Sequence, residues 1–198
     1  MITKPIGYDE AATLGTGDFE EITVGGHVCI IKAAHEDVRN GKRYLVLLFD
    51  IAPEDAQGGY YTRLYNRRVQ SSQNNVDGVV RWPGTYWQGL EGKSTAFFKG
   101  LISSIEKSNP GYSWNWDEKT LKGKKFGGVF GREQYIGRDG APHWSTKCLY
   151  ARSVDGIADV EPPEDKPISS ANYEGYSQPA GVPAGYTPVD EGDDQLPF

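Results

Sequence analysis

The stretch that decides the fold is "HVCIIKAAHEDVRNGKRYLVLLFDI", residues 27–51. Two apolar runs rich in β-branched residues flank the pair Asn40-Gly41. This pair favours a two-residue hairpin turn, because both central positions of such a turn need a positive φ. The sequence therefore predicts two antiparallel strands, 27–38 and 43–51.

Periodicity predicts the next two elements. Alternation in "YYTRLYNRR", residues 60–68, favours a third strand after a loop at 53–59. A helix is predicted over 94–108, where four apolar side chains recur at helical spacing: Phe98, Leu101, Ile102 and Ile105. Residues 69–93 are long, polar and aromatic by turns, and they receive no assignment.

Two further strands, 124–136 and 143–154, are joined by a segment with an Asp-Gly turn signal. The order of three strands, one helix and two strands predicts a mainly β fold: a five-stranded OB-fold barrel with one helix between strands 3 and 4. An OB-fold binds single strands or oligosaccharides on the face of its second and third strands. We expect this domain to span 24–154, after an N-terminal lead-in at 1–23.

Charge divides the chain unevenly. The 198 residues carry a net charge of −6, but 155–198 hold ten acids and one base, a net −9, which leaves +3 for the rest. Seven of the twelve prolines also lie beyond residue 154. We expect 155–198 to be disordered, because such a composition buries too little apolar surface to offset the entropy of ordering. Two explanations fit this charge distribution equally well: a basic binding domain with an acidic interaction tail, or an acidic segment that serves only to keep the protein soluble.

The predicted third strand gives the first candidate site. Alternation places Tyr61, Arg63, Tyr65 and Arg67 on one face. Rings that stack on unpaired bases and guanidinium groups that pair with phosphates are what single-stranded nucleic acid requires. The alternative is a solvated strand face whose tyrosines pack sideways.

Other cations and rings bracket this face. Candidate contacts come from the first turn, from the turn between strands 4 and 5, and from the stretch before strand 4: Arg39, Lys42, Arg43, Arg138, Trp144, Trp114, Trp116 and Lys125. A further cluster, "RWPGTYWQG" at 81–89, cannot be placed. Each tryptophan is equally well explained as part of the core.

Catalysis has little support. His27, Cys29, His143 and Cys148 match no compact zinc pattern, and the acids Asp117, Glu118 and Glu133 lack the paired spacing of a magnesium nuclease. We expect no enzyme activity, no cofactor and no metal. Two cysteines are too few for a disulfide scaffold. With no secretory signal and no membrane-spanning run, the sequence predicts a cytoplasmic protein.

The C-terminal residues "DDQLPF", 193–198, resemble the acidic tip of bacterial single-stranded DNA-binding proteins. In that family the tip docks replication, recombination and repair enzymes. The resemblance implies that Asp193, Asp194, Leu196, Pro197 and Phe198 would bind such partners. Gln195 stands where the common pattern has another acid.

The stretch "FFKGLISSIEKSNPGYSWNWDEKTLKGKKFGGVFGREQY", 97–135, resembles the single-stranded DNA-binding proteins of phages and prophages. The resemblance implies a protein that coats single-stranded DNA without sequence specificity in a bacterial host cell. A carbohydrate-binding β barrel is the alternative, because rings also stack on sugars. The sequence leaves open whether the chain forms a homo-oligomer and whether it prefers DNA to RNA.

Overall fold

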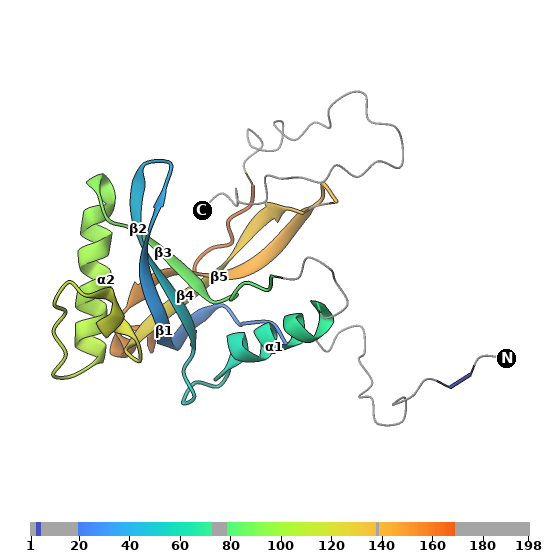
Figure 1. Cartoon of the computed structure of the whole chain (residues 1–198), viewed down its shortest axis with the longest axis horizontal. Coiled ribbons are helices and arrows are strands. Elements are labelled where there is room, and N and C mark those ends of the chain that lie inside the picture. The colour runs from blue at the N-terminus through green and yellow to red at the C-terminus, as the bar shows by residue number, and fades with distance from the viewer. Residues whose placement is uncertain (1–2, 5–19, 73–78, 138, 169–198) are drawn as a thin grey trace.

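The computed structural model describes residues 3–4, 20–72, 79–137 and 139–168, drawn in colour in Figure 1. These residues form a mainly β structure with five strands and two α-helices. The predicted docking residues 193–198 lie outside the described residues, as does Arg138.

The predicted hairpin is confirmed. β1 (Gly25–Arg39) and β2 (Lys42–Ile51) pair antiparallel down to Arg39 opposite Lys42. The two turn residues have positive φ angles, 51° at Asn40 and 72° at Gly41, as the Asn-Gly signal predicts. An irregularity between Ile31 and Ala33 shifts the register, so Ile31 and Ala34 both face the core side of the sheet.

Three more strands complete one antiparallel sheet: β3 (Thr85–Gly89), β4 (Lys125–Ile136) and β5 (Pro142–Arg152). The strand order is β3-β2-β1-β4-β5, so β1 pairs with both β2 and β4. β3 and β5 are the edges of the sheet, and no hydrogen-bonded ladder joins them within the described chain. The sheet is therefore open.

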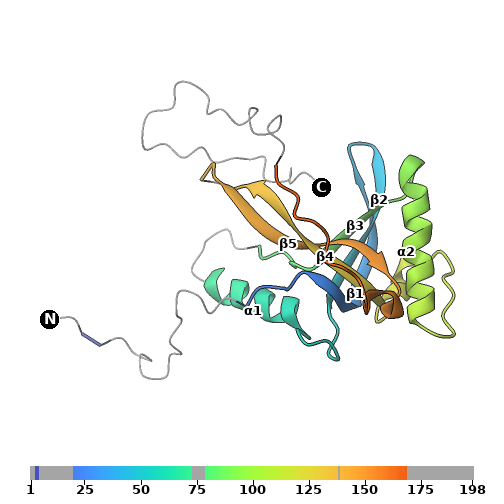
Figure 2. The ribbon, with the colours of Figure 1, turned by 180° about the vertical axis from the view of Figure 1, so that it is seen from behind.

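The core lies between this sheet and the helices. Phe49, Phe126 and Phe130 are fully buried, and Phe49 contacts both of the other rings edge to face. α2 (Thr95–Ser108), the predicted helix, buries Leu101 and Ile105 and packs against β3, β4 and β5. Figures 1 and 2 show α2 alongside the β1–β2 hairpin, with the β4–β5 hairpin projecting separately.

The predicted third strand is wrong. Residues 60–72 form a helix, α1 (Tyr60–Ser72), and the third strand is β3, inside the unassigned segment 69–93. Asp50, at the end of β2, accepts hydrogen bonds from the Tyr61 N–H and the Thr62 hydroxyl, and so caps α1. Helical spacing then turns Tyr60, Tyr61 and Leu64 towards the core.

The boundary predicted at residue 154 is also wrong. Val154–Ile157 form a short 3-10 helix, and Ile157 is buried. Further on, Lys166 exchanges backbone hydrogen bonds with Arg132 and Gln134 of β4. The described residues 155–168 therefore belong to the same folded unit as the sheet. The lead-in also contributes, because Ile22 belongs to the core.

Candidate nucleic-acid interface

One face of the β1–β2–β3 sheet gathers rings and cations. Paired and alternating positions place Arg39, Lys42, Tyr44 and Trp87 on the side opposite the core, and we call this surface the Trp87 face. The Arg39 guanidinium carbon lies 3.9 Å from the Trp87 ring centroid. The Tyr44 and Trp87 centroids are 5.8 Å apart, edge to face. The arrangement combines a stacking ring with cations, as single-strand binding needs.

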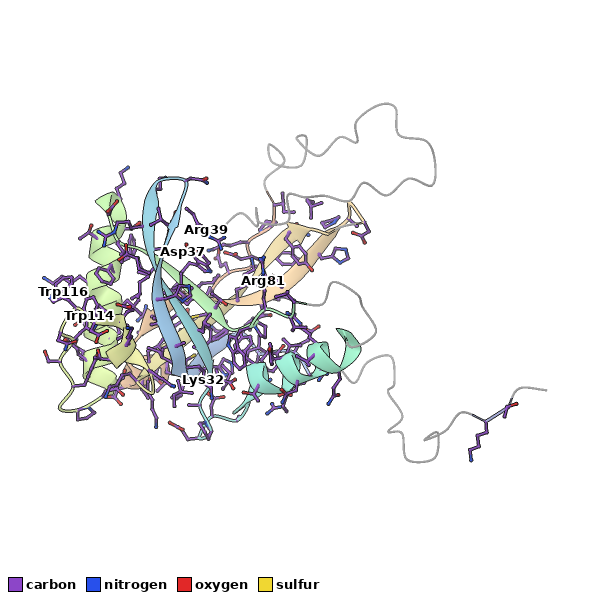
Figure 3. The ribbon with its side chains drawn as sticks, viewed as in Figure 1. Lys32, Asp37, Arg39, Arg81, Trp114 and Trp116 are labelled. Atoms are coloured by element: carbon purple, nitrogen blue, oxygen red, sulfur yellow. The ribbon has the colours of Figure 1, made fainter. Side chains whose placement is uncertain are left out.

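The Trp87 face lies beside a second basic hairpin. Figure 3 shows Arg39 and Arg81 between the β1–β2 hairpin and the β4–β5 hairpin. On the latter, the Arg132 guanidinium carbon lies 5.6 Å from the ring centroid of Trp144, which is partly exposed. Two of the predicted loop positions, Arg39 and Trp144, thus lie on the two hairpins that flank this region.

Several cations already form ion pairs. Arg39 Nε lies 3.3 Å from Asp37 Oδ2, and both side chains are partly exposed. Arg132 pairs with Asp165. Pairs at such exposed positions contribute only about 0–1 kcal/mol. A phosphate can therefore replace the carboxylate at little cost.

The cations and rings predicted from 60–68 do not form a shared site. Tyr61 is buried with its ring 5.3 Å from that of Phe49, so it offers no surface to a base. Arg63 donates to both carboxylate oxygens of Glu20 and to the carbonyl of Gly58. Tyr65 packs against Trp82, with their ring centroids 5.4 Å apart. Arg67 is partly buried on α1. The physical reason is the helix, which separates residues that a strand would align.

Burial raises the pKa of Tyr61 far above its ordinary value. The phenol therefore stays neutral, as expected for a core side chain.

A second group of predicted residues lies on the opposite side of the hairpin. Arg43 donates two hydrogen bonds to Glu36, from Nε at 2.6 Å and from Nη2 at 2.9 Å. These hydrogen bonds hold the pKa of Glu36 below its usual range. Trp114 and Trp116 line the same groove as these two residues. Lys125, the first residue of β4, forms an ion pair with Glu54, with 2.5 Å between Nζ and Oε1.

Trp87 is the residue that sequence reasoning missed. It lies in "TYWQG", residues 85–89, where Tyr86 and Gln88 point to the core side and Trp87 to the outer side. This alternation was the available signal, but five residues are too short to separate a strand from a loop. The cations Arg39 and Lys42 were found because they adjoin a turn of known register.

The described part of the chain contains neither a cluster of potential metal ligands nor a helix that could span a membrane. No three His, Cys, Asp or Glu side chains gather where they could hold a metal ion within 20–72, 79–137 and 139–168. No described helix has the length and apolar character needed to cross a membrane. Both cysteines are free thiols, and burial raises the pKa of Cys148 to about 12.

No protein-family model matches the chain, and a search of curated proteins finds no significant relative.

Proposed function

We propose that this protein binds single-stranded DNA without sequence specificity and that the Trp87 face is the binding surface. The observation that carries the proposal is the Arg39 guanidinium stacked over the Trp87 ring, with Tyr44 and Lys42 beside them. A ring offers a surface to every base, and a guanidinium pairs with a phosphate whatever the base.

The arrangement of strands supports an OB-type fold as part of this proposal. β1 pairs with β2 and β4, α2 packs against both edge strands, and this order of strands is compatible with the partly open barrel of an OB-fold. In an OB-fold, single strands bind across strands 2 and 3 between the loops that join strands 1–2 and 4–5. The location of the Trp87 face on β2 and β3, beside the two hairpins, supports the proposal because it corresponds to these positions.

The proposed cellular role follows from the resemblance of the C-terminal residues. Asp193, Asp194, Leu196, Pro197 and Phe198 would recruit enzymes of DNA replication, recombination or repair to the coated strand, in the cytoplasm of a bacterial host during phage replication. On this proposal, the negative charge and low hydrophobicity of the acidic stretch before them would leave the peptide accessible to such enzymes.

The test is the affinity for a fluorescent oligo-dT at two salt concentrations, with duplex DNA, RNA and an oligosaccharide as competitors. We expect Trp87→Ala to weaken oligo-dT binding about 10- to 100-fold, because stacking on one ring contributes about 1–3 kcal/mol. Trp116→Ala, on the opposite side of the hairpin, is the matched control and should change the affinity less than twofold.

Salt dependence is the second readout. If Arg39, Lys42 and Arg81 each neutralise one phosphate, log K should fall with log salt with a slope of about −2. Binding that ignores salt and is displaced by the oligosaccharide would favour a carbohydrate-binding module instead. Loss of labelled strand on adding magnesium would indicate a nuclease.

A further inference from the structure

A groove of about 220 Å³ lies on the side of the β1–β2 hairpin opposite the Trp87 face. Its apolar wall includes Phe98 of α2 together with Trp114 and Trp116 from the loop after that helix. Its rim carries three carboxylates and one guanidinium: Glu36, Glu91, Glu118 and Arg43. We call it the Trp116 groove. Figure 3 labels its two tryptophans next to α2, away from Arg39 and Arg81.

The two tryptophans have different roles in this groove. Trp114 is fixed, with its ring edge-on to Phe98 at 5.5 Å and its backbone N–H donating to Glu106. The ring centroid of Trp116 lies 4.8 Å from that of Trp114, but the Trp116 side chain is 79% exposed. Its φ of 69° lies in a region that non-glycine residues seldom occupy. The Trp116 ring is therefore exposed to solvent while Trp114 packs beneath it.

The rim gives the groove a negative charge. Arg43 is hydrogen-bonded to Glu36, and its Nη1 lies 3.5 Å from Glu91. Since the lining holds three carboxylates and one guanidinium, it carries a net charge of −2. Phosphates are repelled by such a rim, whereas a cation is attracted both by the carboxylates and by the face of a tryptophan ring.

We propose that the Trp116 groove binds an arginine or lysine side chain of a protein partner. The cation lies over the Trp116 ring and pairs with Glu118. The two elements that line the groove carry further exposed apolar side chains: Phe97 precedes Phe98 on α2, and Val38 is two residues beyond Glu36 on the same strand face. A polypeptide, with apolar residues beside its cation, would cover these as well. This surface is separate from the C-terminal residues and does not depend on DNA binding.

The experiment uses the full chain and a synthetic octapeptide of alternating leucine and arginine, with a leucine-glutamine peptide as the neutral probe. Calorimetry should show the arginine peptide binding at least tenfold more weakly to Trp116→Ala than to the unmodified protein. Glu118→Gln should weaken it about three- to tenfold. Tyr135→Ala, which removes a partly exposed ring on the β4–β5 hairpin, should leave it unchanged.

The comparison with Trp116→Ala is needed because the acidic stretch 155–198 attracts basic peptides in every variant. Trp116 is exposed, so its replacement should preserve the thermal midpoint, which circular dichroism checks. Equal peptide affinity in the two proteins would overturn the proposal. So would a Trp116→Ala variant that loses oligo-dT affinity to the same extent, or one that changes from dimer to monomer in sedimentation.

The two proposals fail separately. If the unmodified protein does not bind oligo-dT, single-stranded DNA binding is wrong, while the peptide comparison still reports on the Trp116 groove.

Discussion

Asp55 joins the start of β1 to the loop after β2 through its carboxylate. It accepts hydrogen bonds from the backbone N–H groups of Val28 and Gln57, at 2.9 and 3.0 Å, and lies 3.1 Å from Nδ1 of His27. The other ring nitrogen of His27 lies 3.0 Å from the Thr23 carbonyl. His27, which the sequence offered as a zinc ligand, thus joins Asp55 in holding the start of β1 against the loop after β2.

The pKa of Asp55 provides a test at this scale. Burial raises it, but the hydrogen bonds from Gln57, His27 and Val28 outweigh burial, so the folded value is below the ordinary value of about 3.9. A carboxyl with a lowered folded pKa stabilises the fold above the unfolded pKa, and this contribution is lost as pH falls through the folded value. We therefore expect the free energy of unfolding to decline below about pH 4.

The measurement is urea denaturation between pH 2.5 and 6. Asp55→Asn should be less stable than the unmodified protein at pH 6 and should lose less stability on acidification. Asp159→Asn, at an exposed position, is the control and should keep the original pH dependence. An unchanged slope in Asp55→Asn would show that other carboxyls govern the acid transition.

Single residues of the site were predictable only where the local structure was. Arg39 and Lys42 adjoin an Asn-Gly turn, so their pairing follows from the sequence. Arg43 is one position further along, and a strand sends it to the opposite face, towards Glu36. The sequence grouped all three. The structure divides them between the Trp87 face and the Trp116 groove.

At the scale of the element, α1 shows why a local pattern can be ambiguous. In "YYTRLYNRR" the apolar positions Tyr60, Tyr61 and Leu64 fit one face of a helix, whereas tyrosine and arginine also alternate from Tyr61 to Arg67 as they would in a strand. Tyrosine and threonine favour strands, but tertiary contacts override such preferences. The contact that favours the helix is the hydrogen bond from the Tyr61 N–H to the Asp50 carboxylate, which lies 11 residues earlier in the chain. A local window cannot contain this information.

Asp50 therefore sets the stability of α1. Its buried carboxylate accepts from the backbone of Ile51 and Tyr61 and from the Thr62 hydroxyl. Asp50→Ala leaves these buried donors unsatisfied and should lower the free energy of unfolding by about 2–3 kcal/mol. Asn66→Ala, exposed on the same helix, should change it by less than about 0.5 kcal/mol. Equal urea midpoints for the two variants would contradict a capping role.

At the scale of the whole molecule, composition located the charge but not the end of the domain. Residues 155–168 are rich in proline and acids, yet Ile157 is buried where added side-chain atoms on Gly26 or Gly127 would collide with it. The backbone at Lys166 pairs with Glu133 of β4, beyond Phe130, which is the last β4 residue that pairs with β1. One buried side chain and a few hydrogen bonds order the segment, and an average over forty residues conceals both.

Two truncations test this division of the chain. Ending the chain after Ile168 removes none of the described contacts, so the free energy of unfolding should be preserved. Ending it after Ser153 removes Ile157 and the pairing with β4, and should destabilise the domain by at least about 2 kcal/mol from the isoleucine alone. If both truncations unfold at the same urea concentration, residues 154–168 do not stabilise the domain.

The chain that ends after Ile168 also lacks the acids of 169–198. Its oligo-dT affinity should therefore be higher than that of the full chain at low salt, and the two affinities should converge as salt screens the charge.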